Sequence, residues 1–216
     1  MNNFPKRIGV TGGIGSGKSY VCRVLAAMGY PVFYSDIEAK KLINTDPELI
    51  DSIKELFGNE AYLNNELNRK HIASAAFSDS GLLSKLNALV HPKVRSAFDE
   101  WASKQDSNYV FQEAAILVET EGYKLLDKTI LVTASLETKI SRVKKRDKLS
   151  EEEISKRMQS QMSDSDKITF VDFVIENDDN SMILPQIKKM FKAHPKPLQS
   201  PKTDKKNTEN IGRYIE

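Results

Sequence analysis

Short apolar runs alternate with helical patterns along most of the chain. Between the runs, apolar residues recur at helical spacing, as Val21, Val24 and Leu25 do. Parallel strands need crossover connections, so this alternation predicts an α/β fold with a mainly parallel five-stranded sheet and helices on both faces. The runs of strand length lie at 7–11, 31–34, 109–111, 128–132 and 170–175.

The alternation is interrupted between the second and third runs. Residues 47–107 contain several helical stretches and no strong strand pattern, and we interpret them as a helical insertion. One of its helices is rich in leucine and is expected to end at His91-Pro92. The insertion therefore interrupts a single α/β unit.

Two serines have a glutamate three residues further on, which is the offset of a capping box. Ser35 with Glu38 predicts the start of the helix after the second strand. Ser150 with Glu153 predicts a polar helix that reaches about Met162. Ser35 follows a predicted strand and Ser150 follows a predicted helix, so a new helix can begin at each.

The composition narrows the class of protein. The chain has 216 residues, 39% of them hydrophobic, which suits one globular domain, and we predict a catalytic domain over 1–192. Its net charge of +2 argues against nucleic acid or an anionic membrane as the main partner. A single cysteine, no signal-like start and no apolar run of about 20 residues predict a cytoplasmic protein. Residues 193–216 are polar and proline-rich, and we expect a flexible tail.

The strongest motif lies between the first strand and the first helix. Gly12-Gly13-Ile14-Gly15-Ser16-Gly17-Lys18-Ser19 matches the phosphate-binding loop pattern G-x-x-x-x-G-K-[ST]. Glycines permit the positive φ angles that turn N–H groups inward, and a helix N-terminus favours anions. We therefore expect ATP here, with Lys18 on the β- and γ-phosphates and the Ser19 hydroxyl on Mg²⁺. The fold is then of the three-layer P-loop NTPase type.

Other candidate residues have two interpretations each. Asp36 follows the second strand and is either a general base or an acid that complements its helix dipole. Arg142 and Arg146 share a helix face. They belong either to an ATP-covering lid over about 142–163 or to a solvated basic face among Lys139, Lys144 and Lys145. Glu113 is either an acid near Mg²⁺ or an ordinary charge at a strand end.

Together these residues resemble the dephospho-CoA kinase family. The resemblance extends from about residue 7 to 192. The phosphate-binding loop is shared with many kinases, but the leucine-rich segment is more diagnostic. The segments that carry it are Val10 to Ser19, Ser35-Asp36, Leu86 to Pro92, Ile116 to Glu119, Arg142 with Arg146-Asp147, Gln161, Asp172, Val174-Ile175 and Asn177.

The resemblance implies phosphorylation of the ribose 3′-hydroxyl of dephospho-CoA by ATP. It assigns Asp36 as base and Arg142 and Arg146 to the lid. It places Asn177 near adenine, and the insertion with His91 and Pro92 at the acceptor. The expected ATP-binding residues are Gly13, Ile14, Gly15, Ser16, Gly17, Lys18, Ser19, Tyr20 and Asn177. The expected partner is a small molecule, with the protein a monomer or small homo-oligomer.

Three positions depart from the family pattern. Tyr20 stands where threonine is usual, Tyr34 where a second acid often precedes the base, and Ala115 where proline often lies. The change at Tyr34 affects only a second carboxylate for Mg²⁺. Two rival functions remain: a P-loop kinase for a nucleoside, nucleotide or shikimate, and a nucleotide-switch protein, which the absence of an Asn-Lys-x-Asp segment disfavours.

Overall fold

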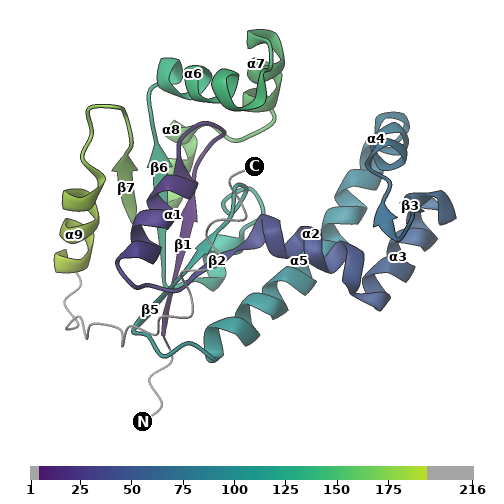
Figure 1. The fold of residues 1–216 in the computed structure, drawn as a ribbon, viewed down its shortest axis with the longest axis horizontal. Coiled ribbons are helices and arrows are strands. Elements are labelled where there is room, and N and C mark those ends of the chain that lie inside the picture. Colours follow the sequence, from purple (N-terminus) through teal and green to yellow (C-terminus); the bar gives the residue numbers. More distant parts are fainter. Residues whose placement is uncertain (1–4, 194–216) are drawn as a thin grey trace.

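A parallel sheet forms the centre of the computed structural model, which describes residues 5–193. Its strand order is β2-β5-β1-β6-β7, and every neighbouring pair is parallel (Figure 1). The prediction of five strands in a parallel sheet is confirmed. The strands are β1 (Lys6–Thr11), β2 (Val32–Tyr34), β5 (Tyr109–Glu113), β6 (Lys128–Thr133) and β7 (Phe173–Glu176).

Helices cover both faces of this sheet, because alternate side chains of its buried strands point to opposite sides. Tyr109 and Phe111 of β5 pack with α1 (Lys18–Ala27) and α9 (Ile183–Ala193) in one apolar cluster. Val110, between them in the strand, packs on the other face with the helices of the insertion. The three layers that the sequence predicts are therefore present.

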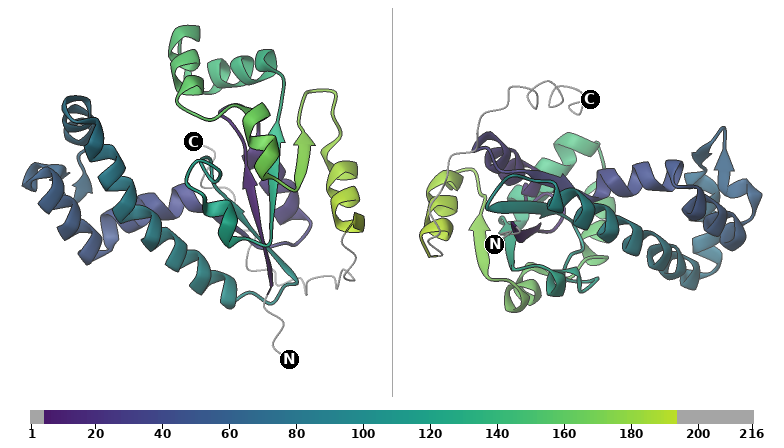
Figure 2. Two further views of the ribbon diagram at one scale, coloured as in Figure 1. Left: turned by 180° about the vertical axis from the view of Figure 1, so that it is seen from behind. Right: turned by 90° about the horizontal axis from the view of Figure 1, so that it is seen from below.

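The insertion is a helical projection at one side of the sheet (Figures 1 and 2). It also contains a short antiparallel hairpin that the sequence pattern did not predict. Asn64 and Asn65 form its turn with φ angles of 53° and 66°, and asparagine tolerates this left-handed region better than most residues. The elements of this region are α2 (Ser35–Thr45), α3 (Pro47–Phe57), η1 (Asn59–Ala61), β3 (Tyr62–Leu63), β4 (Glu66–Leu67), α4 (Arg69–Ser78) and α5 (Ser80–Ser103).

The prediction that the leucine-rich helix ends at His91-Pro92 is wrong, because α5 continues through Pro92 to Ser103. Pro92 lies on the exposed side of the helix. Buried residues at four-residue intervals hold the opposite side against the insertion core, and this packing outweighs the lost backbone hydrogen bond. These residues are Leu86, Val90, Val94, Phe98 and Ala102.

One of the two predicted capping boxes is correct. The Ser150 hydroxyl and the Glu153 carboxylate each bond the other residue's backbone N–H at the start of α7 (Glu151–Gln159). The box at Ser35 is wrong, since Ser35 is already helical and its Oγ accepts a 2.9 Å bond from Gln112 Nε2. Burial of Ser35 beside β5 directs its hydroxyl to the sheet instead of to its own helix.

The segment expected to form a lid lies beyond the carboxyl ends of the strands (Figure 1). It leaves α6 (Leu136–Asp147) through Lys148, whose φ of 54° reverses the chain into α7. The helix predicted to reach Met162 ends earlier, and a short α8 (Asp164–Lys167) follows it. The last strand, β7, starts later than predicted, because η3 (Ile168–Phe170) precedes it. A second short helix, η2 (Gly122–Leu125), lies before β6. No helix among residues 5–193 combines the length and apolar character needed to cross a membrane.

A buried ion pair joins α8 to the segment after β5. Lys167 Nζ lies 2.8 Å from Glu119 Oε1, and the Lys167 side chain is 0% exposed. The same carboxylate oxygen accepts a 3.2 Å bond from the Met162 backbone N–H. Glu119 therefore fixes the point where the chain returns from α7 to the sheet.

We predict that Lys167→Met lowers the free energy of unfolding by about 3 kcal/mol, because it leaves a largely buried carboxylate without its cation. Urea unfolding measures the change. Lys156→Met is the matched control, since Lys156 pairs with Glu152 on the exposed surface of α7 and such pairs contribute about 0.5 kcal/mol. Equal losses of unfolding free energy in the two variants would contradict the assignment of Lys167 and Glu119 as a stabilising buried ion pair.

The predicted tail begins at residue 193, which ends α9, and otherwise lies outside the described residues.

Candidate active site

The glycine-rich loop connects β1 to α1 at the carboxyl edge of the sheet, as its motif predicts. Gly15 and Gly17 have φ angles of 78° and 83°, which only glycine adopts readily. Gly17 also precedes the first turn of α1 as its N-cap. The loop therefore directs backbone N–H groups and a helix N-terminus to one place, which is the requirement for binding phosphate groups.

Two neighbouring segments lie against the loop so closely that side chains are excluded. A methyl group on Gly15 would lie 2.5 Å from the Lys139 carbonyl oxygen in α6. One on Gly17 would overlap the carboxamide of Asn177, the residue after β7. Asn177 is 5% exposed, and its Nδ2 donates a 2.9 Å bond to the Ser16 carbonyl oxygen. Asn177, expected near adenine, is thus positioned to hold the loop.

Lys18 and Ser19, which are expected to contact phosphate and Mg²⁺, are the first two residues of α1. The Ser19 hydroxyl donates a 3.1 Å hydrogen bond to Glu113 Oε1 at the end of β5. Glu113 lies beside Val10 of β1 and Tyr34 of β2 in the sheet register. Adjacent strands therefore bring Glu113 to the phosphate-binding loop, although the two are about a hundred residues apart in sequence.

Glu113 is a partly buried carboxyl group at this edge. Burial raises its pKa above the ordinary value, and the Asp36 carboxylate also raises it, whereas the Lys18 ammonium and the Ser19 hydroxyl lower it. Asp36 is exposed in the first turn of α2, so it can reach a bound molecule. The structure thus brings together Lys18, Ser19, Asp36 and Glu113, as strand-end positions predict.

No group of three or more His, Cys, Asp or Glu side chains arranged to hold a metal ion occurs in the described part of the chain. The residues present still fit Mg²⁺, which is usually held by one or two carboxylates, phosphate oxygens and water. The Ser19 hydroxyl and the Glu113 carboxylate are adjacent oxygen donors of this kind. Tyr34 adds no charge, since burial raises the pKa of its hydroxyl to about 12.

The two arginines of α6 differ in their surroundings. Arg142 Nη1 is buried without a hydrogen-bond partner and would lie 3.4 Å from a methyl group on Gly17, so it faces the loop. Its Nη2 donates a 2.9 Å bond to Asp179. Arg146 is exposed and bonds both oxygens of Asp147, at 2.7 and 2.9 Å. Only Arg142 lies at the phosphate-binding loop in this conformation.

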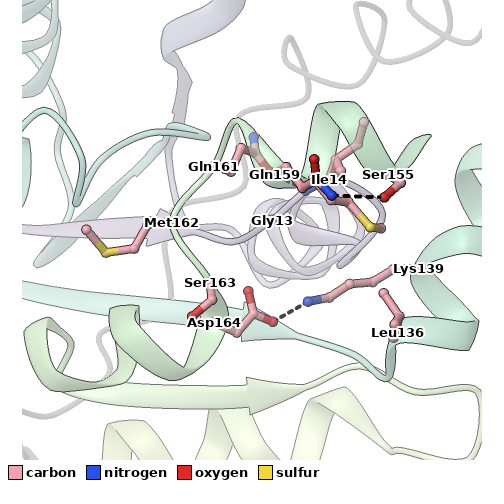
Figure 3. A pocket seen from close by; sticks show the side chains of 11 residues that line it. Gly13, Ile14, Leu136, Lys139, Ser155, Gln159, Gln161, Met162, Ser163 and Asp164 are labelled. Atoms are coloured by element: carbon pink, nitrogen blue, oxygen red, sulfur yellow. Dashed lines mark hydrogen bonds and ion pairs between the residues drawn. The ribbon is translucent and has the colours of Figure 1, made fainter. Parts of the chain in front are cut away.

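Three polar side chains lie beside Gly13 of the loop, Gln161 from the predicted lid and Lys139 and Asp164 from just outside its two ends, and sequence reasoning gave them no role at the loop. Gln161 Oε1 accepts a 2.9 Å bond from the Ile14 backbone N–H. Lys139 is ion-paired with Asp164, whereas sequence reasoning named Lys139 only in the alternative of a solvated basic face. These residues line a cavity of about 360 Å³ beside Gly13 and Ile14 (Figure 3).

The remaining predicted residues lie on two helices. Tyr20 is half-exposed on α1, with Arg23 over its ring at 5.9 Å. His91 and Pro92 lie in α5, which packs against α2, the helix that carries Asp36. Burial lowers the pKa of His91, and nearby Arg95 lowers it further, which favours the neutral imidazole.

Comparisons with known proteins agree with the family resemblance of the sequence. The sequence profile of the family described as dephospho-CoA kinase matches residues 6–183. A dephospho-CoA kinase of Bacteroides fragilis is 40% identical over 182 residues, which cover 84% of this chain and 89% of the relative. One of Chlorobaculum tepidum is 41% identical over 183 residues, or 81% and 88% of the two chains.

Solved structures are similar as well. A protein of Thermus thermophilus, 36% identical, has a TM-score of 0.80 and covers 89% of this chain and 99% of its own. A dephospho-CoA kinase of Campylobacter jejuni is 24% identical with a TM-score of 0.62, and covers 86% of this chain and 95% of its own. At that identity the second likeness supports the P-loop kinase fold alone.

We predict that Gly15→Ala weakens ATP binding by roughly tenfold or more, because the new methyl group meets the α6 backbone and the left-handed φ disfavours alanine. Isothermal titration with ATP measures the loss. Gly81→Ala is the control, since that glycine lies in the first turn of α5 without a positive φ. Unchanged affinity in Gly15→Ala would show that the loop does not need this close contact.

We predict that Glu113→Gln makes the protein more stable at pH 7 and lowers turnover by roughly tenfold or more. The raised pKa means that the folded state binds the proton more tightly than the unfolded chain does. Ionisation of Glu113 therefore costs stability as the pH rises above its ordinary pKa of 4.5, and the cost is complete above the raised pKa.

The stability gain of Glu113→Gln should disappear as the pH is lowered below 4.5, where both states of the wild-type protein hold the proton. Urea unfolding at several pH values follows the difference. Glu176→Gln, at the exposed end of β7, is expected to show no such gain. A gain in Glu113→Gln that is the same at every pH would contradict the titration of this carboxyl group.

Proposed function

The chain belongs to the dephospho-CoA kinase family, and we propose that its Asp36 carboxylate receives the ribose 3′-hydroxyl of dephospho-CoA opposite ATP. The protein is an ATP-dependent kinase for a small molecule. The observation that carries the proposal is the meeting of Asp36, Glu113, Ser19 and Lys18 at one edge of the sheet. A phosphate site and an exposed carboxylate then face the same space, as transfer between two bound molecules requires.

The phosphate end of the site is formed by the loop and α1. We expect backbone N–H groups of the loop to bind the phosphates, and Lys18 to neutralise charge at the β- and γ-positions. Ser19 and Glu113 would hold Mg²⁺, which when bound supplies positive charge to the phosphate oxygens. Their hydrogen bond already places both oxygens side by side.

The acceptor end is formed by α2 and the helical insertion. Asp36 would orient the 3′-hydroxyl and accept its proton while oxygen attacks the γ-phosphorus. His91 lies in the helix packed against α2, and its neutral imidazole can exchange hydrogen bonds with the acceptor. The proposal includes acceptor binding by His91 and Pro92, and by the helical insertion over about 47–107 that contains them.

The lid, residues 142–163, would complete the site. Arg142 already faces the loop with an unpartnered Nη1, which suits a bound nucleotide. Arg146 is held by Asp147 and would reach the γ-phosphate only after that pair opens. We therefore propose that closure brings Arg146 to the transferring group and excludes water, within one kinase domain over 1–192.

Purified protein with Mg·ATP and one acceptor at a time tests the function. We expect ADP release with dephospho-CoA and a product with the mass of CoA. Adenosine, nucleoside monophosphates and shikimate serve as parallel acceptors, because other P-loop kinases use such molecules. Turnover with one of these and none with dephospho-CoA would overturn the acceptor assignment.

We predict that Asp36→Asn lowers kcat by roughly 10²–10⁴-fold and leaves KM for ATP nearly unchanged, because the amide cannot accept the proton. Steady-state kinetics with dephospho-CoA measure both constants. Glu38→Gln is the matched control, since Glu38 lies in the same first turn and pairs with Lys41. Turnover of Asp36→Asn close to that of the wild-type enzyme would remove Asp36 as the base.

A further inference from the structure

A polar cluster closes the base of the lid beside the phosphate-binding loop. Lys139 of α6 and Asp164 of α8 are ion-paired, and the Thr133 hydroxyl at the end of β6 donates to the same Asp164 oxygen. The side chains of Lys139 and Asp164 are only 14% and 17% exposed. The pair therefore joins the two ends of the segment that contains α7 (Figure 3).

This cluster lies directly against the phosphate-binding loop. A methyl group built on Gly13 would lie 3.4 Å from Asp164 Oδ1 and 3.9 Å from Lys139 Nζ. The ion pair fixes the Asp164 side chain, and its backbone is fixed as the first residue of α8. The N-cap of this helix is Ser163, whose hydroxyl accepts a hydrogen bond from the Asp166 backbone N–H. A fixed carboxylate therefore lies beside the loop that receives the triphosphate.

A carboxylate at this position would repel the phosphates, since like charges a few ångströms apart in a partly buried site interact strongly. The Lys139 ammonium removes that repulsion by neutralising Asp164. Lys139 itself is held in register, because its backbone packs on Gly15 of the loop. The two opposite charges act on the phosphates as a nearly neutral pair.

We propose that Lys139 is a positioning residue for ATP, which neutralises Asp164 beside the phosphate-binding loop and so permits the triphosphate to bind. The inference rests on the proposed function, because it needs ATP in that loop. It gives Lys139 a role through Asp164 and not through direct contact with phosphate. The pair, not either charge alone, then sets the affinity.

A set of variants separates these roles by titration calorimetry with ATP and with ADP. We expect Lys139→Met to weaken ATP binding by roughly tenfold or more and to weaken ADP binding less, since ADP carries less charge. Asp164→Asn added to Lys139→Met should restore ATP affinity to within about threefold of wild type. Asp164→Asn alone should bind ATP at least as tightly as wild type, which also tests the proposal if Lys139→Met does not fold.

Lys128→Met is the matched control, because Lys128 pairs with Asp172 at 2.5 Å at the start of β6, the end of the sheet away from the loop. It should leave both affinities unchanged. Failure of the double variant to regain affinity would overturn the proposal and make Lys139 a direct phosphate ligand. Equal losses for ATP and ADP would also overturn it, as expected of a purely structural role. Wild-type protein that does not bind ATP would instead refute the proposed function.

Discussion

The close contact between the glycines of the phosphate-binding loop and the neighbouring segments is the constraint on which the rest of the structure depends. The loop turns its N–H groups inward only with positive φ angles at Gly15 and Gly17. Backbone of α6 and the carboxamide of Asn177 then fill the space that side chains would need. Because both come from segments far along the chain, the loop is complete only when the parallel sheet has formed.

The same sheet brings the proposed site residues together at its carboxyl edge. Neighbouring strands β1, β2 and β5 end in the phosphate-binding loop, the helix with Asp36, and Glu113. Burial raises the pKa of Glu113, so the arrangement costs stability at neutral pH. We propose that the gain accompanying this cost is an oxygen donor for Mg²⁺ beside Ser19.

Local patterns in the sequence predicted the parts of the fold and site that local chemistry determines. The five strands, the phosphate-binding loop and the capping box at Ser150 follow from spacing along the chain. Contacts between distant residues explain the misses. Packing of the buried face of α5 keeps this helix continuous through Pro92. The Ser35 hydroxyl accepts a hydrogen bond from Gln112 of β5 instead of capping its own helix. The pairing of Lys139 with Asp164 needs the return of the chain from α7, which no local pattern encodes.

The central claim is that Asp36 binds the acceptor hydroxyl while the phosphate-binding loop binds the triphosphate, both at the same edge of the sheet. A crystal structure with dephospho-CoA, Mg²⁺ and a non-hydrolysable ATP analogue tests it most directly. The account predicts the ribose 3′-hydroxyl within hydrogen-bond distance of the Asp36 carboxylate and in line with the γ-phosphorus. A 3′-hydroxyl bound away from Asp36, with the nucleotide in the loop, would contradict it.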